Sequence, residues 1–145
     1  MSDRTFTVIV LGTPAPQGSK RHVGGGRMIE SSKHVAPWRQ AVIHCCVLAD
    51  VYGILLRNPV RVDITFRLQR PKGHYGVSGL PKPSAPFAPA VKPDLDKLVR
   101  STLDGLTDAA VWRDDSQVIE LAARKTYATH ADRVGALIEI AVEQP

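Results

Sequence analysis

The stretch from Val60 to Leu68 constrains the fold more than any other part of the sequence. It alternates between apolar and polar residues: Val60, Val62, Ile64, Phe66 and Leu68 take one register, and Arg61, Asp63, Thr65 and Arg67 take the other. Because successive side chains of a strand point to opposite faces, this alternation predicts a β-strand with one buried face. We expect three further strands: Thr5 to Leu11, Gln117 to Tyr127 and Arg133 to Val142.

Two segments between these strands have helical periodicity. From about Ala36 to Tyr52, the apolar positions Trp38, Ala41, Val42, Cys45 and Ala49 fall on one side. Pro93 to Leu106 does the same with Leu95, Leu98, Val99, Thr102, Leu103 and Leu106. The predicted order is β-α-β-loop-α-β-β, a single α/β (α+β) domain of residues 1–145 in which helices flank a small mixed sheet. The adjacent Cys45 and Cys46 are expected to be reduced core residues, since neighbouring cysteines rarely form a disulfide.

Proline and glycine mark two irregular segments. Gly12 to Arg27 is expected to be a mobile basic loop without regular structure, in which Lys20 and Arg21 either contact DNA phosphates or form a solvated surface. Arg70 to Lys92 contains five prolines and is too long for an ordinary connection, so we expect either a functional flap or a partly disordered excursion.

The charge distribution separates the chain into a basic part and an acidic part. The chain carries 19 Lys and Arg against 14 Asp and Glu, and its acids gather between Asp94 and Glu120. Cations hold a polyanion and carboxylates hold a metal, so the pattern suits an enzyme that cuts phosphodiesters. A solvated mixed surface would give the same composition. No apolar run approaches the ~20 residues that cross a bilayer, so we expect a cytoplasmic protein without membrane contact.

Two acidic pairs are the candidates for chemistry. Asp94 and Asp96 stand at the start of the second expected helix, and Asp114 and Asp115 stand just before the next strand. Aspartates of this kind can hold Mg²⁺, which would activate water for phosphodiester hydrolysis. Each pair also has a structural interpretation, because Asp94 and Asp96 can complement the helix dipole and Asp114-Asp115 can form a turn.

Arg100 lies four residues after Asp96 and Asp104 four residues after that, on the same helix face. Arg100 is either the partner in a weak ion pair with Asp96 or a cation for the scissile phosphate. Asp104 is a candidate for supporting Arg100 electrostatically.

Three blocks of residues taken together resemble a known family. They are Lys92-Pro93-Asp94-Leu95-Asp96-Lys97-Leu98, then Leu103-Asp104-Gly105-Leu106, then Val111-Trp112-Arg113-Asp114-Asp115-Ser116-Gln117-Val118. This composite pattern, strongest from Lys92 to Lys125, resembles the RusA family of Holliday-junction resolvases. The basic loop and the Trp38 helix look like the looser N-terminal part of phage and prophage members, an origin that would place the protein in the host cytoplasm.

The resemblance implies a homodimeric nuclease that cuts four-way DNA junctions by paired nicks with Mg²⁺, for which Mn²⁺ would substitute. It assigns Asp94, Asp96 and Asp115 as metal-binding catalytic acids and Asp114 as a supporting acid. The family's catalytic lysine falls on Arg100, which keeps the charge but effectively never deprotonates. Lys97 stands where many members have asparagine and is a supporting candidate.

The expected DNA contacts are the basic residues around this acidic centre: Lys20, Arg21, Arg27, Arg61, Arg67, Lys72 and Lys92. Two alternatives remain open. One is a branched-DNA binding protein that cuts weakly because arginine replaces the lysine, and the other is a less selective nuclease for flaps or forks.

Overall fold

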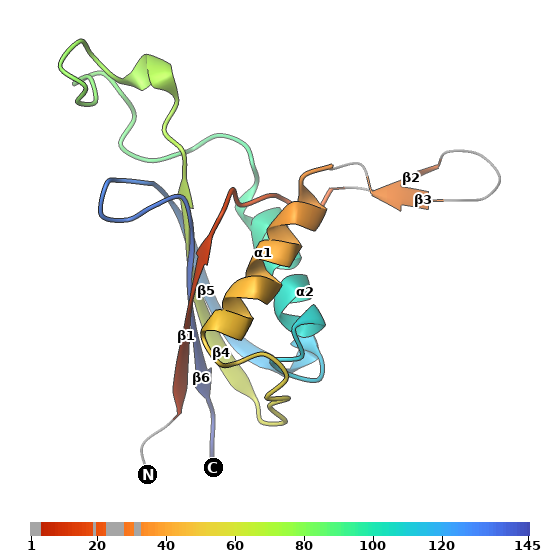
Figure 1. Cartoon of the computed structure of the whole chain (residues 1–145). Coiled ribbons are helices and arrows are strands. Elements are labelled where there is room, and N and C mark those ends of the chain that lie inside the picture. Colours follow the sequence, from red (N-terminus) through yellow and green to blue (C-terminus); the bar gives the residue numbers. More distant parts are fainter. Residues whose placement is uncertain (1–3, 19, 23–27, 31–32) are drawn as a thin grey trace.

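The computed structural model describes residues 4–18 and 33–145 in full, together with the backbone of residues 20–22 and 28–30 (Figure 1). Its centre is a four-stranded mixed sheet in the order β1-β6-β4-β5. The strands are β1 (Thr5–Leu11), β4 (Val60–Leu68), β5 (Val118–Tyr127) and β6 (Gly135–Val142). β4 pairs with β5 in parallel, whereas the β1–β6 and β4–β6 pairs are antiparallel. The α+β class and the mixed sheet predicted from the sequence are confirmed.

Both long helices, α1 (Val35–Leu48) and α2 (Leu95–Asp108), lie on the same face of the sheet (Figure 1). Side chains from that face and from the two helices form one core. Its largest buried members are Trp38, Trp112, Phe66, Ile64, Leu98, Leu106, Ile138 and Ile140. The predicted alternation of β4 is confirmed, with Val60, Val62, Ile64 and Phe66 buried. The two cysteines are free and buried, as expected, and burial raises the pKa of the Cys46 thiol to about 12.

The two helices cross closely because of Gly105. A Cβ atom added there would lie 3.0 Å from the Cβ of Val42 on α1. The indole Nε1 of Trp38 donates a hydrogen bond to Thr102 Oγ1 (3.1 Å), which in turn donates to the carbonyl of Leu98 (2.8 Å). This polar link between the helices fixes α2, the element that carries the first acidic pair, against α1 and the sheet.

The sequence prediction differs from the structure in the two irregular segments. Lys20–His22 (β2) lies inside the segment for which we expected no regular structure, and it pairs with Met28–Glu30 (β3), just after that segment, in a separate two-stranded sheet. Glycine and proline interrupt elements without preventing short strands on either side. α2 begins at Leu95 rather than Pro93, because Asp94 has an extended backbone (φ −68°, ψ 136°) and occupies the N-cap position.

The flap, residues 70–92, is held by specific contacts. It contains a 3₁₀ helix, η1 (Lys72–His74), and a bridge between Tyr75 and Pro81. The guanidinium of Arg70 lies 4.1 Å from the centroid of the Tyr127 ring and donates to the carbonyl of Pro86 (2.7 Å). Figure 1 shows the flap extending past the end of the sheet before the chain returns to α2.

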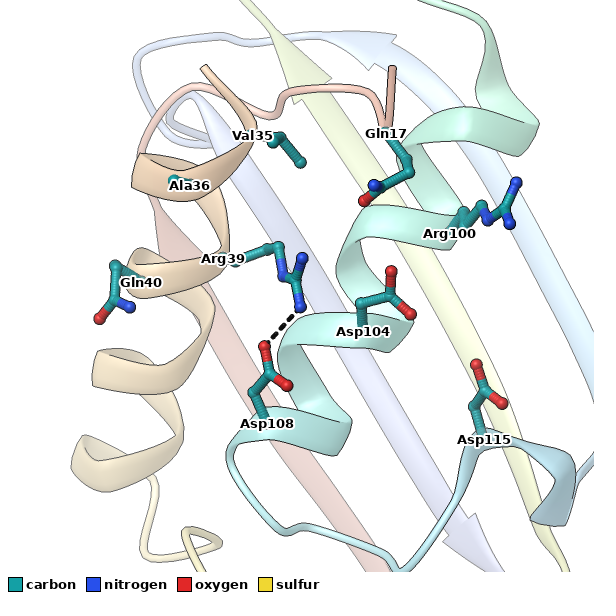
Figure 2. Close-up of a pocket in the computed structure, with 9 residues that line it drawn as sticks. All are labelled: Gln17, Val35, Ala36, Arg39, Gln40, Arg100, Asp104, Asp108 and Asp115. Atoms are coloured by element: carbon teal, nitrogen blue, oxygen red, sulfur yellow. Dashed lines mark hydrogen bonds and ion pairs between the residues drawn. The ribbon is translucent and has the colours of Figure 1, made fainter. Parts of the chain in front are cut away.

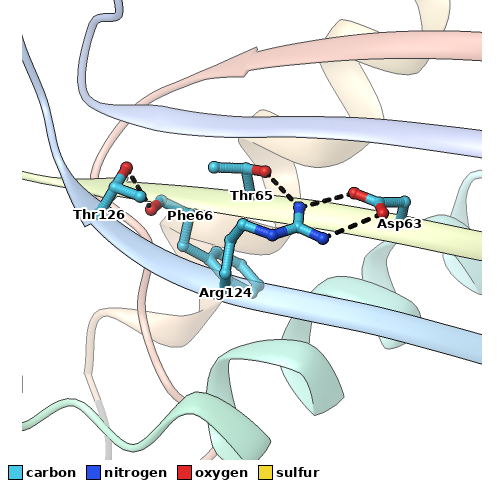
Figure 3. A network of polar contacts seen from close by, with 5 residues as sticks. All are labelled: Asp63, Thr65, Phe66, Arg124 and Thr126. Carbon is cyan, nitrogen blue, oxygen red and sulfur yellow. Dashed lines mark hydrogen bonds and ion pairs between the residues drawn. The ribbon is translucent and has the colours of Figure 1, made fainter.

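No helix of the described part of the chain lies over the other face of the sheet (Figure 1). There Arg124 of β5 donates to both carboxylate oxygens of Asp63 (2.7 and 3.0 Å) and to Thr65 Oγ1 (2.6 Å), as Figure 3 shows. These hydrogen bonds are the main reason why the pKa of Asp63 is lowered. No helix among the described residues is both long and apolar enough to span a membrane.

Candidate active site

A stripe of charged residues runs along α2 on the side away from the core. Asp96, Arg100, Asp104 and Asp108 follow one another at intervals of four residues, which places them on neighbouring turns of one helix face. Leu98, Thr102 and Leu106 are buried on the opposite side. The amphipathic pattern of the helix therefore decides which of its residues face the core and which are left to face solvent.

Three residues of this stripe, Arg100, Asp104 and Asp108, face a cleft between α1 and α2 with a volume of about 710 Å³ (Figure 2). Its lining residues are Gln17, Val35, Ala36, Arg39, Gln40, Arg100, Asp104, Asp108 and Asp115. Across it, Arg39 of α1 donates to Asp108 of α2 (2.7 Å). This ion pair ties the helices together at one end of the cleft and leaves Arg100 and Asp104 at the other.

The second acidic pair lies in a turn that its own neighbours hold in place. Asp114 caps the short 3₁₀ helix η2 (Asp115–Gln117), because its carboxylate accepts a hydrogen bond from the backbone N–H of Ser116 (2.9 Å). This bonding lowers the pKa of Asp114. The side chain of Gln117 completes a capping box by accepting from the N–H groups of Arg113 (2.9 Å) and Asp114 (3.0 Å).

Gln117 also joins the turn to the body of the protein. Its Nε2 donates to the carbonyls of Leu56 (2.9 Å) and Asn58 (3.0 Å), in the segment leading to β4. Trp112, buried at the other end of the turn, donates to Thr107 Oγ1 of α2 (2.8 Å). The turn is therefore fixed from both ends by Trp112 and Gln117.

Asp115 is the acid that this turn leaves available. Its carboxylate takes part in no hydrogen bond or ion pair among the described residues and lines the cleft. Figure 2 shows it directed toward the same space as the carboxylate of Asp104, and Arg100 lies one turn nearer the N-terminus of α2. Burial raises the pKa of Asp104; Arg39 opposes that rise, and the nearby charge of Asp115 adds to it. Besides the Arg39–Asp108 ion pair, the cleft thus brings together the carboxylates of Asp104 and Asp115 and the guanidinium of Arg100.

The first acidic pair is placed by contacts from other elements. Lys125 of β5 donates from Nζ to the carbonyls of Val91 (2.7 Å) and Pro93 (2.9 Å), directly before Asp94. The exposed Asp94 carboxylate lies 3.7 Å from Lys97 Nζ, and the exposed Asp96 begins the stripe of α2. On the other side of α2, Ser101 Oγ donates to the carbonyl of Ala15 (2.6 Å), which fixes the loop after β1 against the helix.

A family model described as Endodeoxyribonuclease RusA matches residues 12–141 of this chain, which is most of its length. The chain belongs to the RusA endodeoxyribonuclease family. No individual curated protein matches it closely enough to add to this assignment. Membership identifies the chain as a hydrolase that acts on DNA, and implies the Holliday-junction resolvase activity of the family.

The predicted site residues fall into three groups. Arg100, Asp104 and Asp115 line the cleft together. Asp94, Asp96, Lys97 and Lys92 lie at or just before the beginning of α2 and do not line it. Asp114 is exposed and serves the turn. Among the described residues no three His, Cys, Asp or Glu side chains come together closely enough to hold a metal by themselves.

RusA-type nucleases generally need a divalent metal, and the chemistry of the residues present fits one. The candidate donors are exposed carboxylates, the ligands that a hard cation prefers. Mg²⁺ usually keeps several waters and binds through one or two carboxylates together with substrate phosphate oxygens. A preformed set of three protein ligands is therefore not required before DNA binds.

The predicted DNA-binding residues have different surroundings. Arg61 pairs with Glu143 and lies 3.9 Å from Glu120, and Arg67 lies 3.7 Å from Asp132; both belong to the sheet face without helices. Lys72 is exposed on the flap, and Lys92 is exposed just before α2. The side chains of Lys20 and Arg21, and the whole of Arg27, lie outside the described residues.

Two residues near the site were missed by the sequence analysis. Arg39 reaches across the cleft, and its signal was a charge directly after the buried Trp38 in an apolar helix. Lys125 anchors the segment before Asp94, and its signal was a lysine in the register of Ala123 and Tyr127, the side of β5 that faces the helices. A cation in an apolar register usually has a specific partner.

Proposed function

We propose that this chain is a Mg²⁺-dependent endonuclease that resolves four-way DNA junctions by paired nicks as a homodimer, with Mn²⁺ as a substitute metal. The observation that carries the proposal is the position of Asp115. Its neighbours Trp112, Asp114 and Gln117 are all used to hold the turn, whereas its own carboxylate is left facing a cleft that also contains Arg100. A preorganised carboxylate beside a cation suits phosphodiester chemistry.

In this proposal Asp94, Asp96 and Asp115 hold the metal, which when bound polarises the phosphoryl oxygen and activates a water molecule. Arg100 binds the scissile phosphate and stabilises negative charge that develops during the reaction. Its guanidinium keeps its proton, so we assign it no proton transfer. Asp114 keeps the turn in place, Asp104 supports Arg100 electrostatically, and Lys97 pairs with Asp94.

A two-fold homodimer would present two such sites to strands of the same polarity in a junction, which gives paired nicks without additional chemistry. The arms would be gripped by Lys20, Arg21, Arg27, Arg61, Arg67, Lys72 and Lys92. Lys72 and Lys92 are exposed, whereas Arg61 and Arg67 must first leave their carboxylate partners. Binding through phosphates should weaken steeply as salt rises. The protein would act in the cytoplasm, or in the host cytoplasm if a phage encodes it.

An end-labelled four-way junction, a fork and a matched linear duplex test this proposal. Each is incubated with wild type, Asp96→Asn or Asp115→Asn, in Mg²⁺ or in EDTA. We expect symmetric nicks in the junction alone, which require Mg²⁺ and both aspartates. Equal cutting of a fork or a linear duplex would replace the resolvase with a less selective nuclease.

Arg100 provides a specific reason to keep a second candidate function, a branched-DNA binding protein that cuts poorly. Comparison of Arg100→Lys with Arg100→Ala separates the two functions. If Arg100 anchors phosphate, the lysine variant cuts the junction and the alanine variant does not. Tight junction binding by wild type without nicks, together with strong cutting by Arg100→Lys, would favour the binding protein.

A further inference from the structure

A second pocket, with a volume of about 960 Å³, opens beside the flap at the end of the sheet. Its walls come from three places: the flap, the segment after β1, and the connection between β5 and β6. Tyr75, Phe87 and Tyr127 contribute aromatic rings, and Arg70, His130 and Arg133 contribute nitrogen donors. Among the described residues that line it, none is an aspartate or a glutamate. The volume lies within the range of about 300–1,000 Å³ that is usual for ligand sites.

One wall of this pocket is built before any ligand arrives. Arg70 stacks over Tyr127, donates to the carbonyl of Pro86, and has its Nη1 atom 3.2 Å from His74 Nδ1. The rings of His74 and Tyr127 also form a T-shaped pair, with centroids 5.6 Å apart. These contacts attach the flap to β5 and fix the chain immediately before Phe87, so the site is preorganised.

Phe87 also belongs to this wall, and its exposed aromatic ring makes no contribution to the buried core. It is 94% exposed although it follows the anchored Pro86 and lines the pocket. An aromatic ring presented to water by a fixed backbone offers a large apolar surface to a binding partner.

The charge of the pocket indicates what that partner is. Arg133 is exposed and takes part in no ion pair among the described residues, and the pocket lacks carboxylates that would neutralise it. Proteins that bind single-stranded nucleic acid combine aromatic side chains, on which bases stack, with cations that follow the phosphates. A paired base in a continuous duplex is already stacked between its neighbours, so it has no free face for an aromatic ring.

We propose that this pocket binds an unpaired nucleotide of the DNA substrate, with its base stacked on Phe87 and its phosphate on Arg133. The inference rests on the proposed function in that branched DNA is the substrate. It adds a structural source of selectivity, because a branch point offers unpaired or unstacked bases and an intact duplex does not. The pocket is separate from the carboxylate cleft, so it acts on binding and not on the chemical step.

The test measures dissociation constants of the full chain in EDTA, where metal-dependent cutting is prevented. The three DNAs are a four-way junction with 2-aminopurine at the branch, a matched duplex and an oligothymidylate. Phe87→Ala and Arg133→Ala are compared with Val77→Ala, a matched control that removes a fully exposed apolar side chain of the same flap away from the pocket.

We expect Phe87→Ala to weaken binding of the junction and of oligothymidylate by about 5- to 150-fold, the range for loss of one base–aromatic stack. Duplex affinity should change less than about 2-fold, and Val77→Ala should change no affinity beyond that. Arg133→Ala should weaken the same two DNAs and reduce the salt dependence of their binding. The change of 2-aminopurine fluorescence on binding should be lost with Phe87→Ala and kept with Val77→Ala.

Equal losses of affinity for duplex and junction, or no loss of affinity with Phe87→Ala, would overturn the proposal that this pocket binds an unpaired nucleotide. Oligothymidylate keeps this result distinct from the proposed function. If wild type cuts the junction and Phe87→Ala binds DNA normally, the proposed nuclease function stands and the proposed nucleotide pocket is wrong. If oligothymidylate binding depends on Phe87 but the junction is not cut, the nucleotide pocket stands and the proposed resolvase function is wrong.

Discussion

The two acidic segments of the site are built in opposite ways. In residues 112–117 the side chains of Trp112, Asp114 and Gln117 make the contacts that hold the turn, and only local neighbours are needed to cap it. In residues 92–96 the acidic side chains are exposed, and the backbone before them is held from β5 by Lys125. One segment is thus held by its own side chains, which also reach the carbonyls of Leu56 and Asn58, and the other by a side chain from a distant strand. The contacts of each aspartate therefore add to what its motif indicates.

The adjacent pair Asp114-Asp115 gives the sharpest comparison. We expect Asp115→Ala to lower junction cleavage by about 100-fold or more, because even outer partners of metal ligands are worth 10–100-fold. Its stability should stay within ~0.5 kcal/mol, since its carboxylate is exposed and holds nothing among the described residues. Asp114→Ala should do the reverse: it should lower the free energy of unfolding, because the cap of the turn is lost, and should retain most of the cleavage.

Single-turnover cleavage and urea unfolding of both variants check this reversal. If Asp114→Ala were as inactive as Asp115→Ala while remaining equally stable, the division between a structural and a chemical aspartate would be wrong. The pair also shows the limit of sequence reasoning. Residue type alone does not distinguish adjacent aspartates; the family resemblance gives them different roles, and the structure adds that Asp114 accepts from the Ser116 N–H whereas Asp115 lines the cleft.

Gln117 tests whether the second segment depends on its own side chains. Gln117→Leu removes two accepted and two donated hydrogen bonds, all between 2.9 and 3.0 Å. We expect a loss of about 2 kcal/mol in the free energy of unfolding, since each bond contributes roughly 0.5–1.5 kcal/mol and the freed groups are partly open to water. Thermal and urea unfolding measure it. Gln117→Glu is the matched control, because it keeps the two accepting contacts and should lose less than the leucine variant.

Lys125 is the corresponding test of the first segment. Lys125→Met keeps the aliphatic stem but frees the carbonyls of Val91 and Pro93, so the backbone before Asp94 loses its anchor. We expect a loss of about 10-fold in kcat for junction cleavage, with KM little changed, because small displacements of a positioning element lower the chemical step. Lys125→Arg should recover part of the rate, since it restores a cationic donor.

A different result would change the comparison. If Lys125→Met raised KM and left kcat unchanged, Lys125 would contact DNA and would not position Asp94. A loss of stability with both kinetic constants unchanged would make the anchor purely structural. The measurements are steady-state cleavage at several junction concentrations and urea unfolding of the same preparations.

The contrast also explains which parts of the molecule could be predicted. The alternation in residues 60–68 gave β4 with its bounds and its buried face, because the period of a strand is local information. The prediction was wrong where it expected no strand at β2 and where it began the second helix at Pro93. Pairing partners and cap geometry depend on backbone contacts, which the local sequence does not show. Strand β5 shows the same limit, because Ile119 alternates in step with the apolar Leu121 and Ala123 and yet is 64% exposed, beside a register shift between Val60 and Arg61 of β4. The cleft itself was not predictable, because Arg39 and Asp115 meet α2 from elements far apart in the chain.

Asp63 provides the smallest expected effect and a control for the whole comparison. It is an aspartate with a cationic partner, Arg124, but it lies on the sheet face without helices (Figure 3). Asp63→Asn should leave junction cleavage unchanged. It should cost less than about 1 kcal/mol of stability at neutral pH, because both side chains of the pair are nearly half exposed and solvent screens them.

The pH dependence of that small loss follows from the sign of the pKa shift. Hydrogen bonds from Arg124 lower the pKa of Asp63 in the folded protein below 3.8, so its contribution is fully present above that value and is lost as the pH falls through the folded-state pKa. The difference in stability between wild type and Asp63→Asn should therefore be constant from pH 7 down to about 5 and should disappear in more acidic solution. Urea unfolding across this range measures it. A difference that grew as the pH fell would mean that the carboxylate destabilises the fold, and a loss of cleavage would mean that the helix-free face also belongs to the site.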